Sequence, residues 1–382
     1  MKPADGNNPS AGFFILTKGV YMSSRIKVGI LGATGMVGQN YVCLLNQHPW
    51  FEVAYVAASS QSSNKSYEEA VAGRWHMSCP IPESVRDLFV QNASDVSAAQ
   101  NKCDVVFSAV NMDKKTVATL ELEYASTGFA VISNNSAHRF TSDVPMVIPE
   151  INPEHLDIIP FQRKKRGWTG LIAVKSNCSI QSYMTPLYAL VREGYEIRRM
   201  VITTLQALSG AGYPGPSALD VIDNIVPFIK GEEEKSQDEP LKIFGNIVDG
   251  AFVNNSSIKI SAHCNRVPVI HGHTACVSVE FGDRKPALEE IRTIWRNFRS
   301  VPQELALPFA PERPIIYCPE PDRPQPQKDR DLDKGMAVTV GRLRPCNVFD
   351  VRFVGLHHNT VRGAAGGGIL TAELLKARGF IN

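Results

Sequence analysis

The sequence predicts an α/β protein with two domains: a doubly wound parallel sheet, followed by an α+β domain whose sheet is mostly antiparallel. Three observations predict this. Apolar strands alternate with helical segments through the first ~150 residues, which is typical of a parallel sheet. Longer strands then cluster with few helices between them, which favours antiparallel pairing. The chain of 382 residues is too long for one simple core and suits two domains.

The first ordered segment changes from a strand to a helix across a glycine-rich turn. Residues 26–31 are apolar, and apolar side chains recur at helical spacing over 37–45. Gly32, Gly35 and Gly38 lie in the turn between them. In this context a G-x-x-G-x-x-G motif indicates a pyrophosphate bound at the helix N-terminus, although a tight turn without a ligand has the same pattern.

The alternation continues with strands at 51–59, 103–110 and 129–133 and a helix at 116–126. We therefore expect a Rossmann domain. The end of its second strand indicates NADP rather than NAD, because no acidic residue precedes Glu68 to bind a ribose 2′-hydroxyl. A 2′-phosphate could instead meet hydroxyl groups and a cation, namely Ser59, Ser60, Ser62 and Lys65.

The second half predicts longer strands and few helices. We expect helices at 183–193, 286–298 and 369–376, with the last one closing on Gly379. The strands are expected at 198–208, 256–269, 274–281, 336–343 and 348–356. The Pro-rich, charged segment 319–331 is predicted to be a surface loop.

One cysteine stands out by its position. In KSNCSI, Cys178 follows an apolar strand and opens a predicted helix. Unpaired N–H groups at a helix N-terminus favour a thiolate, which is the nucleophilic form. A free cysteine is more often an inert buried side chain, so this position alone leaves both interpretations open.

Composition excludes several classes of protein. Lys and Arg number 40 against 38 Asp and Glu, and this balance of +2 indicates neither a nucleic-acid nor a membrane partner. The eight cysteines form no CxxC pair, which predicts neither a disulfide framework nor a zinc site and favours a reducing, cytoplasmic compartment. The histidines show no metal-binding spacing, so no metal is expected. Residues 1–24 are expected to be a disordered extension, with Met22 as a second candidate start.

Six motifs occur in one order: GATGMVGQ, SNNSAHR, SNCSIQ, LQALSGAG, CNRVPVIHGHT and HNTVRGAAGG. From about Arg25 to the C-terminus the sequence thereby resembles aspartate-semialdehyde dehydrogenases, in particular the fungal and archaeal branch. The resemblance implies an N-terminal Rossmann NADP-binding domain (25–175 and 356–382) and an α+β catalytic and dimerisation domain (176–355). It also implies a homodimer or homotetramer.

The resemblance implies a reaction as well. Aspartyl phosphate is reversibly converted to aspartate semialdehyde by NADPH, through a cysteine thioester, in the biosynthesis of threonine, methionine, isoleucine and, in some organisms, lysine. Cys178 would be the nucleophile, His273 the acid/base and Gln206 the residue that orients the acyl group. Five further positions would bind substrate: Arg266 the carboxylate, Glu232 the ammonium group, and Asn177, Arg139 and Lys235 the phosphate. The cofactor contacts would be Gly32, Thr34, Gly35, Met36, Val37, Ser59, Ser60, Ser62, Ser108, Ser209, Gly210 and Asn359.

Other functions compete with this one. Malonyl-CoA reductase shares the fold and the cysteine chemistry, but its substrate offers a carboxylate to Arg266 and no ammonium group to Glu232. N-acetyl-glutamyl-phosphate reductase is a weaker rival. A non-catalytic NADP sensor would need none of Cys178, Gln206 or His273.

Overall fold

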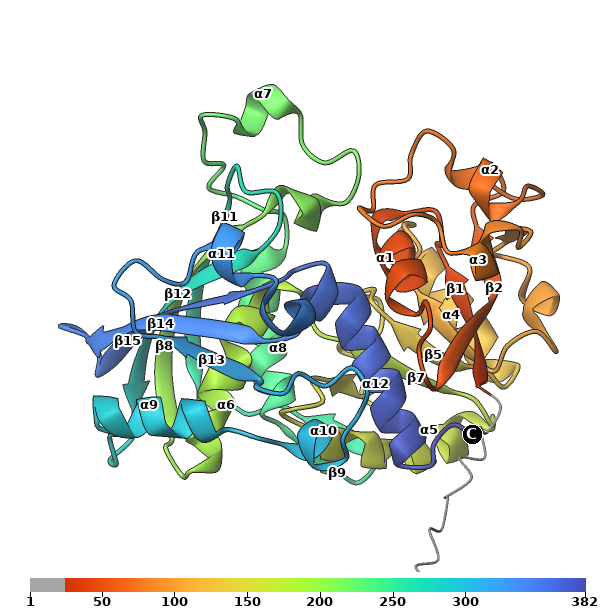
Figure 1. Ribbon diagram of the computed structural model, residues 1–382. Coiled ribbons are helices and arrows are strands. Elements are labelled where there is room, and N and C mark those ends of the chain that lie inside the picture. The colour runs from red at the N-terminus through yellow and green to blue at the C-terminus, as the bar shows by residue number, and fades with distance from the viewer. Residues whose placement is uncertain (1–24) are drawn as a thin grey trace, which may run out of the picture.

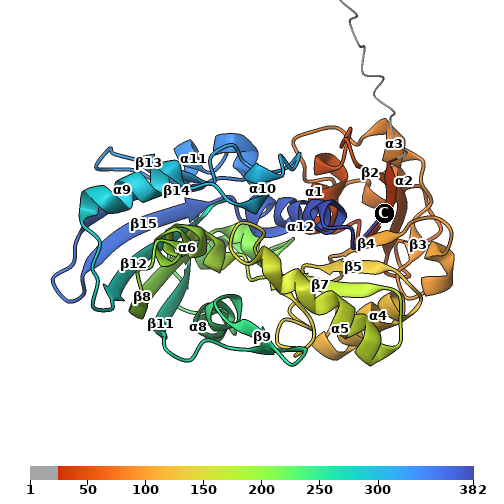
Figure 2. The ribbon, with the colours of Figure 1, turned by 90° about the horizontal axis from the view of Figure 1, so that it is seen from below.

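The computed structural model describes residues 25–382, in two domains that lie side by side (Figure 1). The predicted extension, residues 1–24, lies outside the described residues. Helix α12 (Gly366–Ala377) returns from the second domain and packs against β5, β7 and α1 of the first (Figure 2). Among residues 25–382, no helix is long and apolar enough to cross a membrane.

The first domain is built on a parallel sheet of seven strands in the order β3-β2-β1-β4-β5-β7-β6. This confirms the prediction of a Rossmann-like domain. Its strands are β1 (Ile26–Leu31), β2 (Phe51–Ala58), β3 (Gln91–Asn92), β4 (Val105–Ser108), β5 (Ala130–Ser133), β6 (Met146–Val147) and β7 (Leu171–Lys175). Its helices are α1 (Met36–Leu44), α2 (Tyr67–Val71), α3 (Glu83–Arg86), α4 (Lys114–Ser126) and α5 (Ile159–Arg166).

The second domain has a sheet of six strands in the order β11-β8-β12-β15-β14-β13. The strands are β8 (Ile197–Gln206), β11 (Lys259–Arg266), β12 (His273–Phe281), β13 (Ile315–Cys318), β14 (Val338–Pro345) and β15 (Val351–His357). The three central pairs are antiparallel, but the outer pairs, β11 with β8 and β13 with β14, are parallel. The sheet is therefore mixed rather than mostly antiparallel. Both outer pairs are joined by long crossover connections, whose direction strand periodicity does not reveal.

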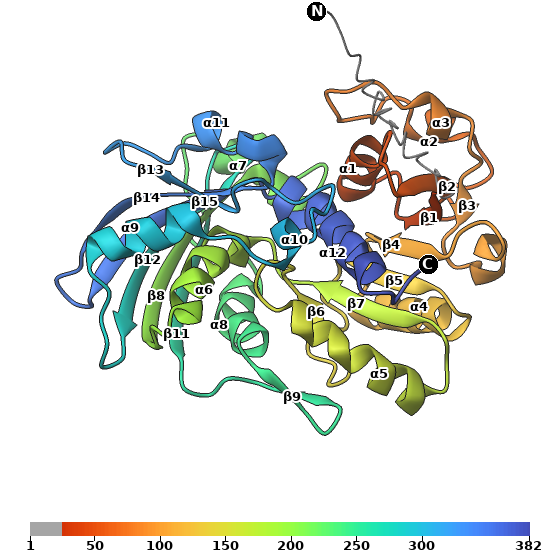
Figure 3. The same cartoon turned by 60° about the horizontal axis from the view of Figure 1, so that its bottom comes forward.

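Helices cover one face of this sheet (Figure 3). They are α6 (Met184–Arg192), α8 (Glu232–Ile243) and α9 (Leu288–Asn297), and Trp295 of α9 is fully buried in the same cluster as Ile202 and Val277 of the sheet. On the opposite face the side chains alternate outward, and Val201 and Cys276 are exposed there. One face of the sheet is thus apolar and covered, while residues 25–382 leave side chains such as Val201 and Cys276 exposed on the other.

Several small elements were not predicted. They include the hairpin β9 (Asn246–Val248) and β10 (Ala251–Val253), and the short helices α7 (Ala218–Val221), α10 (Val301–Glu304) and α11 (Pro326–Asp329). Helices α2, α3, α5 and α8 and strands β3, β6 and β13 were not predicted either. Helix α11 lies in the predicted surface loop 319–331. That loop is held by the carboxylate of Asp329, which is 1% exposed and is paired with Arg323.

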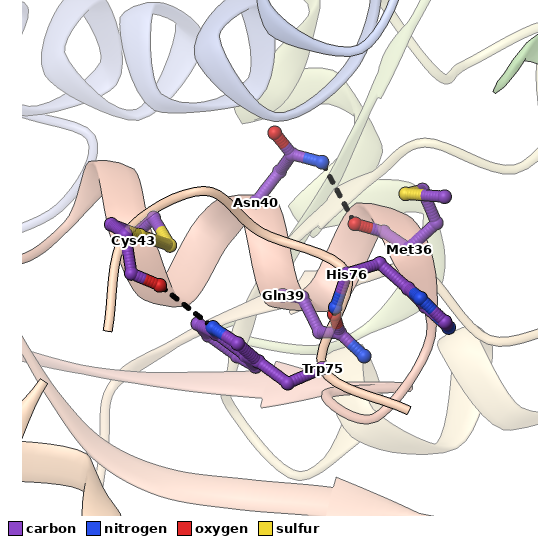
Figure 4. The surroundings of a disulfide bond; sticks show 7 residues. Met36, Gln39, Asn40, Cys43, Trp75 and His76 are labelled. Carbon is purple, nitrogen blue, oxygen red and sulfur yellow. Dashed lines mark hydrogen bonds between the residues drawn. A yellow bond between two sulfur atoms is a disulfide. The ribbon is translucent and has the colours of Figure 1, made fainter. Parts of the chain in front are cut away.

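Within residues 25–382, a single disulfide bond joins Cys43 of α1 to Cys79 (Figure 4), a bridge that the scattered spacing of the cysteines did not predict. The two residues are 36 positions apart, a separation that carries no spacing signal. The bridged segment is also held by hydrogen bonds: the Trp75 indole donates to the Cys79 carbonyl (2.7 Å), and the His76 N–H donates to Gln39 Oε1 (2.9 Å).

Candidate active site

Cys178 lies just beyond the carboxyl end of β7, where parallel sheets commonly bind ligands. It does not open α6 as predicted. It precedes a single 3₁₀ turn, Ser179–Ser182, whose first N–H donates to Asn177 Oδ1 at 2.7 Å. Because this turn is short and its first N–H is already bonded, the helix dipole does little to stabilise a thiolate at the sulfur. Nearby charged side chains must therefore supply most of that stabilisation.

The imidazole of His273 faces this cysteine. Its Nε2 lies 3.4 Å from Cys178 Sγ, while its Nδ1 accepts the backbone N–H of Ala207 at 3.0 Å. A neutral imidazole whose Nδ1 accepts carries its proton on Nε2. Burial, together with Arg266, holds the pKa of His273 well below its ordinary value, so the ring is neutral at pH 7 and presents an N–H donor to the sulfur.

The other two candidate histidines do not reach the sulfur. His263 is exposed on β11, and His271 Nδ1 lies 2.9 Å from Ser209 Oγ. Of the three, only His273 contacts Cys178 among the described residues.

Glu232, the first residue of α8, gathers three of the predicted side chains. Its carboxylate accepts from Lys235 Nζ (2.8 Å), Asn177 Nδ2 (3.0 Å) and Gln206 Nε2 (3.2 Å). Glu232 is 8% exposed, so the acidic run does not simply face water. Its neighbour Glu233 instead accepts the N–H of Cys264.

Arg266 is the last residue of β11 and donates from Nη1 to the Ala207 carbonyl at 2.5 Å. A side chain at Gly210 would put its Cβ 2.9 Å from this nitrogen and 3.0 Å from His273 Nε2. Glycine therefore keeps open the space between the guanidinium and the imidazole.

Arg139 is tied into a buried ion pair. Its guanidinium donates to Glu239 Oε1 (2.8 Å), to the Lys175 carbonyl (3.0 Å) and to the Asn134 carbonyl (3.0 Å). Glu239 is fully buried and also accepts the N–H of Asn177 at 2.6 Å. This pair fixes the loop that carries Cys178.

A cavity of about 430 Å³ between the two domains brings many of these residues together. Nine predicted residues line it: Val37, Arg139, Asn177, Cys178, Ser209, Gly210, Glu232, Lys235 and Asn359. Gln206, Arg266 and His273 are not among the lining residues, although each is within one hydrogen bond or contact of a residue that is. The remaining predicted cofactor positions lie outside this cavity: Gly32, Thr34, Gly35, Met36, Ser59, Ser60, Ser62 and Ser108.

The glycine turn fits a dinucleotide. Helix α1 begins after Gly35 with no side-chain cap and no acid in its first turn, so its N–H groups can meet a pyrophosphate. Gly32 has φ +83°, and a Cβ on Gly38 would lie 2.2 Å from the Gly32 carbonyl oxygen. Both glycines are needed for the helix to start this close to the strand.

The end of β2 differs in detail from the prediction. Ser59, Ser60 and Lys65 are exposed, whereas Ser62 is buried and accepts from the guanidinium of Arg74 at 2.8 Å. Sequence reasoning missed Arg74. Gln39 holds that segment against the glycine turn, because its amide donates to the carbonyls of Thr34 (3.0 Å) and Arg74 (2.8 Å).

Of three other predicted cofactor residues, two lie at the cavity wall and one is buried. Ser209 Oγ accepts from Asn359 Nδ2 at 2.9 Å, so these two residues hold each other at the cavity wall. Ser108 is fully buried beneath it and accepts from Asn135 at 3.1 Å.

Known proteins and family models match most of the chain. Residues 27–159 match the model for "Semialdehyde dehydrogenase, NAD binding domain", and residues 187–362 match "Semialdehyde dehydrogenase, dimerisation domain". An aspartate-semialdehyde dehydrogenase of Methanothermobacter thermautotrophicus is 46% identical over 355 residues, covering 92% of this chain and 99% of the relative. The chain belongs to the aspartate-semialdehyde dehydrogenase family.

Fungal members of the aspartate-semialdehyde dehydrogenase family are similarly close. The Candida albicans enzyme is 42% identical over 366 residues, covering 93% of this chain and 99% of that one. The crystal structure of a Candida albicans enzyme with NADP superposes with a TM-score of 0.85 at 41% identity, covering 94% of this chain and all of that one. This supports the resemblance to the fungal and archaeal branch of the family.

Two charged residues of the site were not predicted. Lys175 is 3% exposed and lines the cavity, and Glu239 lies on the same face of α8 as Glu232, seven residues later. Helical spacing from Glu232 could have found Glu239. No pattern separates Lys175 from an ordinary lysine at the end of a strand.

Proposed function

We propose that this chain is an NADP-dependent aspartate-semialdehyde dehydrogenase. The observation that carries the proposal is the contact between Cys178 Sγ and the Nε2–H of His273. This contact lies at a cavity that also holds a carboxylate and cations for an amino-acid substrate.

In the oxidative direction, the thiolate of Cys178 attacks the aldehyde carbon, forming a C–S bond and an oxyanion. The Nε2–H of His273 donates a hydrogen bond to that oxyanion. NADP supplies the acceptor for the hydride that the same carbon loses. Phosphate then attacks the Cys178 thioester, which releases the thiolate and aspartyl phosphate, and the reductive direction reverses these steps.

The substrate's charges have separate partners. Arg266 pairs with the α-carboxylate, since a guanidinium presents two parallel donors. Glu232 pairs with the ammonium group, which displaces Lys235 from the carboxylate. Lys235, 30% exposed at the cavity wall, is then free to bind phosphate together with Arg139 and Asn177, while Gln206 orients the acyl group.

For the cofactor we propose that the uncapped start of α1, with Gly32, Thr34, Gly35, Met36 and Val37, binds the pyrophosphate. The nicotinamide end would lie beside Ser209, Gly210 and Asn359. Ser62, together with Ser59 and Ser60, would bind the 2′-phosphate, because no acidic residue follows β2 before Glu68.

We further propose a cytoplasmic homodimer or homotetramer, in which one interface buries the open face of the six-stranded sheet. Cross-strand partners on that face form a row of His263, Thr203, Cys276 and Val354. Val201→Glu on the same face should shift the mass measured by light scattering from dimer or tetramer toward monomer. The cofactor domain would comprise 25–175 and 356–382, although β15 runs across that second boundary and ends at His357.

One assay tests the function. Purified enzyme with NADP and aspartate semialdehyde should form NADPH only when phosphate is added. NADPH-dependent reduction of malonyl-CoA should be far slower, because that substrate leaves Glu232 without an ammonium partner. Faster turnover of malonyl-CoA, with no response to phosphate, would overturn the proposal.

A further inference from the structure

Lys175 is the last residue of β7 and precedes the nucleophile by three positions. Its side chain is buried against α12, where a Cβ on Gly367 would come within 3.3 Å of the lysine Cε. It lines the cavity with Cys178, and its ammonium group has one hydrogen-bond acceptor among residues 25–382, the Ser176 carbonyl at 2.7 Å. Two of its three N–H donors therefore remain for a ligand or the sulfur.

The other cations of the site are differently engaged. Arg139 pairs with Glu239, and Lys235 pairs with Glu232, each at 2.8 Å. Within the described chain, Lys175 and Arg266 have no carboxylate oxygen within 4.0 Å of their side-chain nitrogens. Arg266 lies on the His273 side and is proposed to take the substrate carboxylate. Lys175 is therefore the remaining cation near the thiol, and no anion has been assigned to it.

A second buried lysine makes the contrast clear. Lys242 is 2% exposed, and its ammonium donates to three backbone carbonyls: Arg139 (2.7 Å), Thr141 (3.1 Å) and Val144 (2.8 Å). All three donors of Lys242 are satisfied away from the cavity, so it has a structural role. Lys175 is buried to a similar degree, but only one of its three N–H donors has an acceptor among the described residues.

We propose that the ammonium group of Lys175 stabilises the thiolate of Cys178 and is the main cation that activates it. This rests on the proposed function only in taking Cys178 as the nucleophile. The charges that face the pair are those of Arg139, Arg266, Arg362, Glu232 and Glu239, with the neutral imidazoles of His273 and His357 beside them.

Burial opposes the charge on each of the two groups, and their attraction for each other offsets part of that cost. Burial lowers the pKa of Lys175 to about 7, even with the charge on Cys178 acting to raise it. Burial, followed by Glu232, raises the pKa of the Cys178 thiol on balance, and Lys175, followed by Arg139 and Arg266, offsets part of that rise. Each charge thus favours the other.

The test measures the thiol directly and needs no substrate. The rate of alkylation of the full-length enzyme by iodoacetamide is followed from pH 5 to 10, with modification at Cys178 quantified by mass spectrometry. Lys175→Met should raise the alkylation midpoint by about 1–3 pH units, the range for loss of one adjacent opposite charge. Lys175→Arg should recover most of that shift. Circular dichroism and NADPH binding check that each variant is folded.

Lys242→Met is the matched control and should lower stability without moving the midpoint. An unchanged midpoint in Lys175→Met, or an equal shift in Lys242→Met, overturns the proposal. If Lys175→Met does not fold, the wild-type enzyme still decides: blocking Cys178 as a methyl disulfide should lower the pKa of Lys175, followed by NMR of ¹³C-labelled lysine. A Lys175 pKa that does not change on blocking refutes the coupling, whatever substrate the enzyme uses.

Discussion

The two ends of the cofactor and substrate site are built on different physical principles. At the nucleophile, charges are already paired: Arg139–Glu239 is buried, and Lys235–Glu232 is partly buried. At the end of β2, the groups proposed for the 2′-phosphate are exposed, apart from Ser62. Buried pairs hold geometry strongly and are costly to break, whereas exposed groups act weakly and are easily exchanged. We therefore expect substitutions near the nucleophile to lower turnover strongly, and substitutions at the end of β2 to change the choice of cofactor by small amounts.

The largest effect should come from the nucleophile. Cys178→Ser should lower turnover on the order of 10⁴–10⁶-fold, since a serine hydroxyl is not ionised beside a neutral histidine that presents an N–H. NADPH binding, measured by fluorescence titration, should stay close to wild type because the cofactor end is untouched. Turnover near the wild-type level would remove Cys178 from the mechanism.

His273 should rank second. His273→Asn should lower kcat about 10²–10⁴-fold, because the oxyanion loses its Nε2–H donor. His271→Asn is the control, since that ring contacts Ser209 rather than the sulfur. A crippling His271 variant beside a mild His273 variant would show that the wrong histidine has been assigned.

The buried pair at the nucleophile should matter for stability as well. Glu239→Gln leaves the Arg139 charge buried without its anion, which typically costs about 3–5 kcal/mol in the free energy of unfolding. The exposed pair Arg378–Asp157 is the comparison, and Asp157→Asn should cost about 1 kcal/mol or less. Urea unfolding of both variants measures the difference, and equal losses would mean that burial does not distinguish the two pairs.

Sequence patterns predicted the two ends of the site unequally. Cys178 and His273 belong to motifs whose joint order is specific, whereas Glu232 lies in an acidic run between two of these motifs. All three lie at the same site. The longer strands of the first domain were predicted because buried parallel strands are continuous apolar runs, whereas the two-residue strands β3 and β6 were not. Strand direction at the edges of the second sheet was not, because it depends on crossovers between distant segments.

Individual charges were missed for a similar reason. Lys175 lies at the end of a strand, and Arg74 lies in a loop. Sequence alone does not say whether a basic side chain at such a position points inward or to solvent. Their roles depend on neighbours such as Gly367 and Ser62, which folding brings to them.

The smallest effect should arise at the cofactor end. Arg74 is held by Ser62 and by the Gln39 bond to its carbonyl, so its guanidinium stays beside the end of β2 while remaining exposed to a ligand. Arg74→Met should weaken NADPH binding roughly 10-fold, which corresponds to the loss of one partly exposed charge-assisted hydrogen bond. NADH binding should stay unchanged, because NADH has no 2′-phosphate. Fluorescence titration of both cofactors, and calorimetry with adenosine 2′,5′-bisphosphate, measure this without turnover.

Lys65→Met is the matched control for Arg74. Lys65 is exposed, and none of the hydrogen bonds or ion pairs of the described chain fixes its ammonium group, so it must lose side-chain entropy to meet a phosphate. We expect its loss to change NADPH binding less than about threefold. If Lys65→Met abolishes the preference for NADPH and Arg74→Met does not, the 2′-phosphate is bound by the flexible lysine. Cofactor choice at this end would then not depend on the Arg74–Ser62 contact.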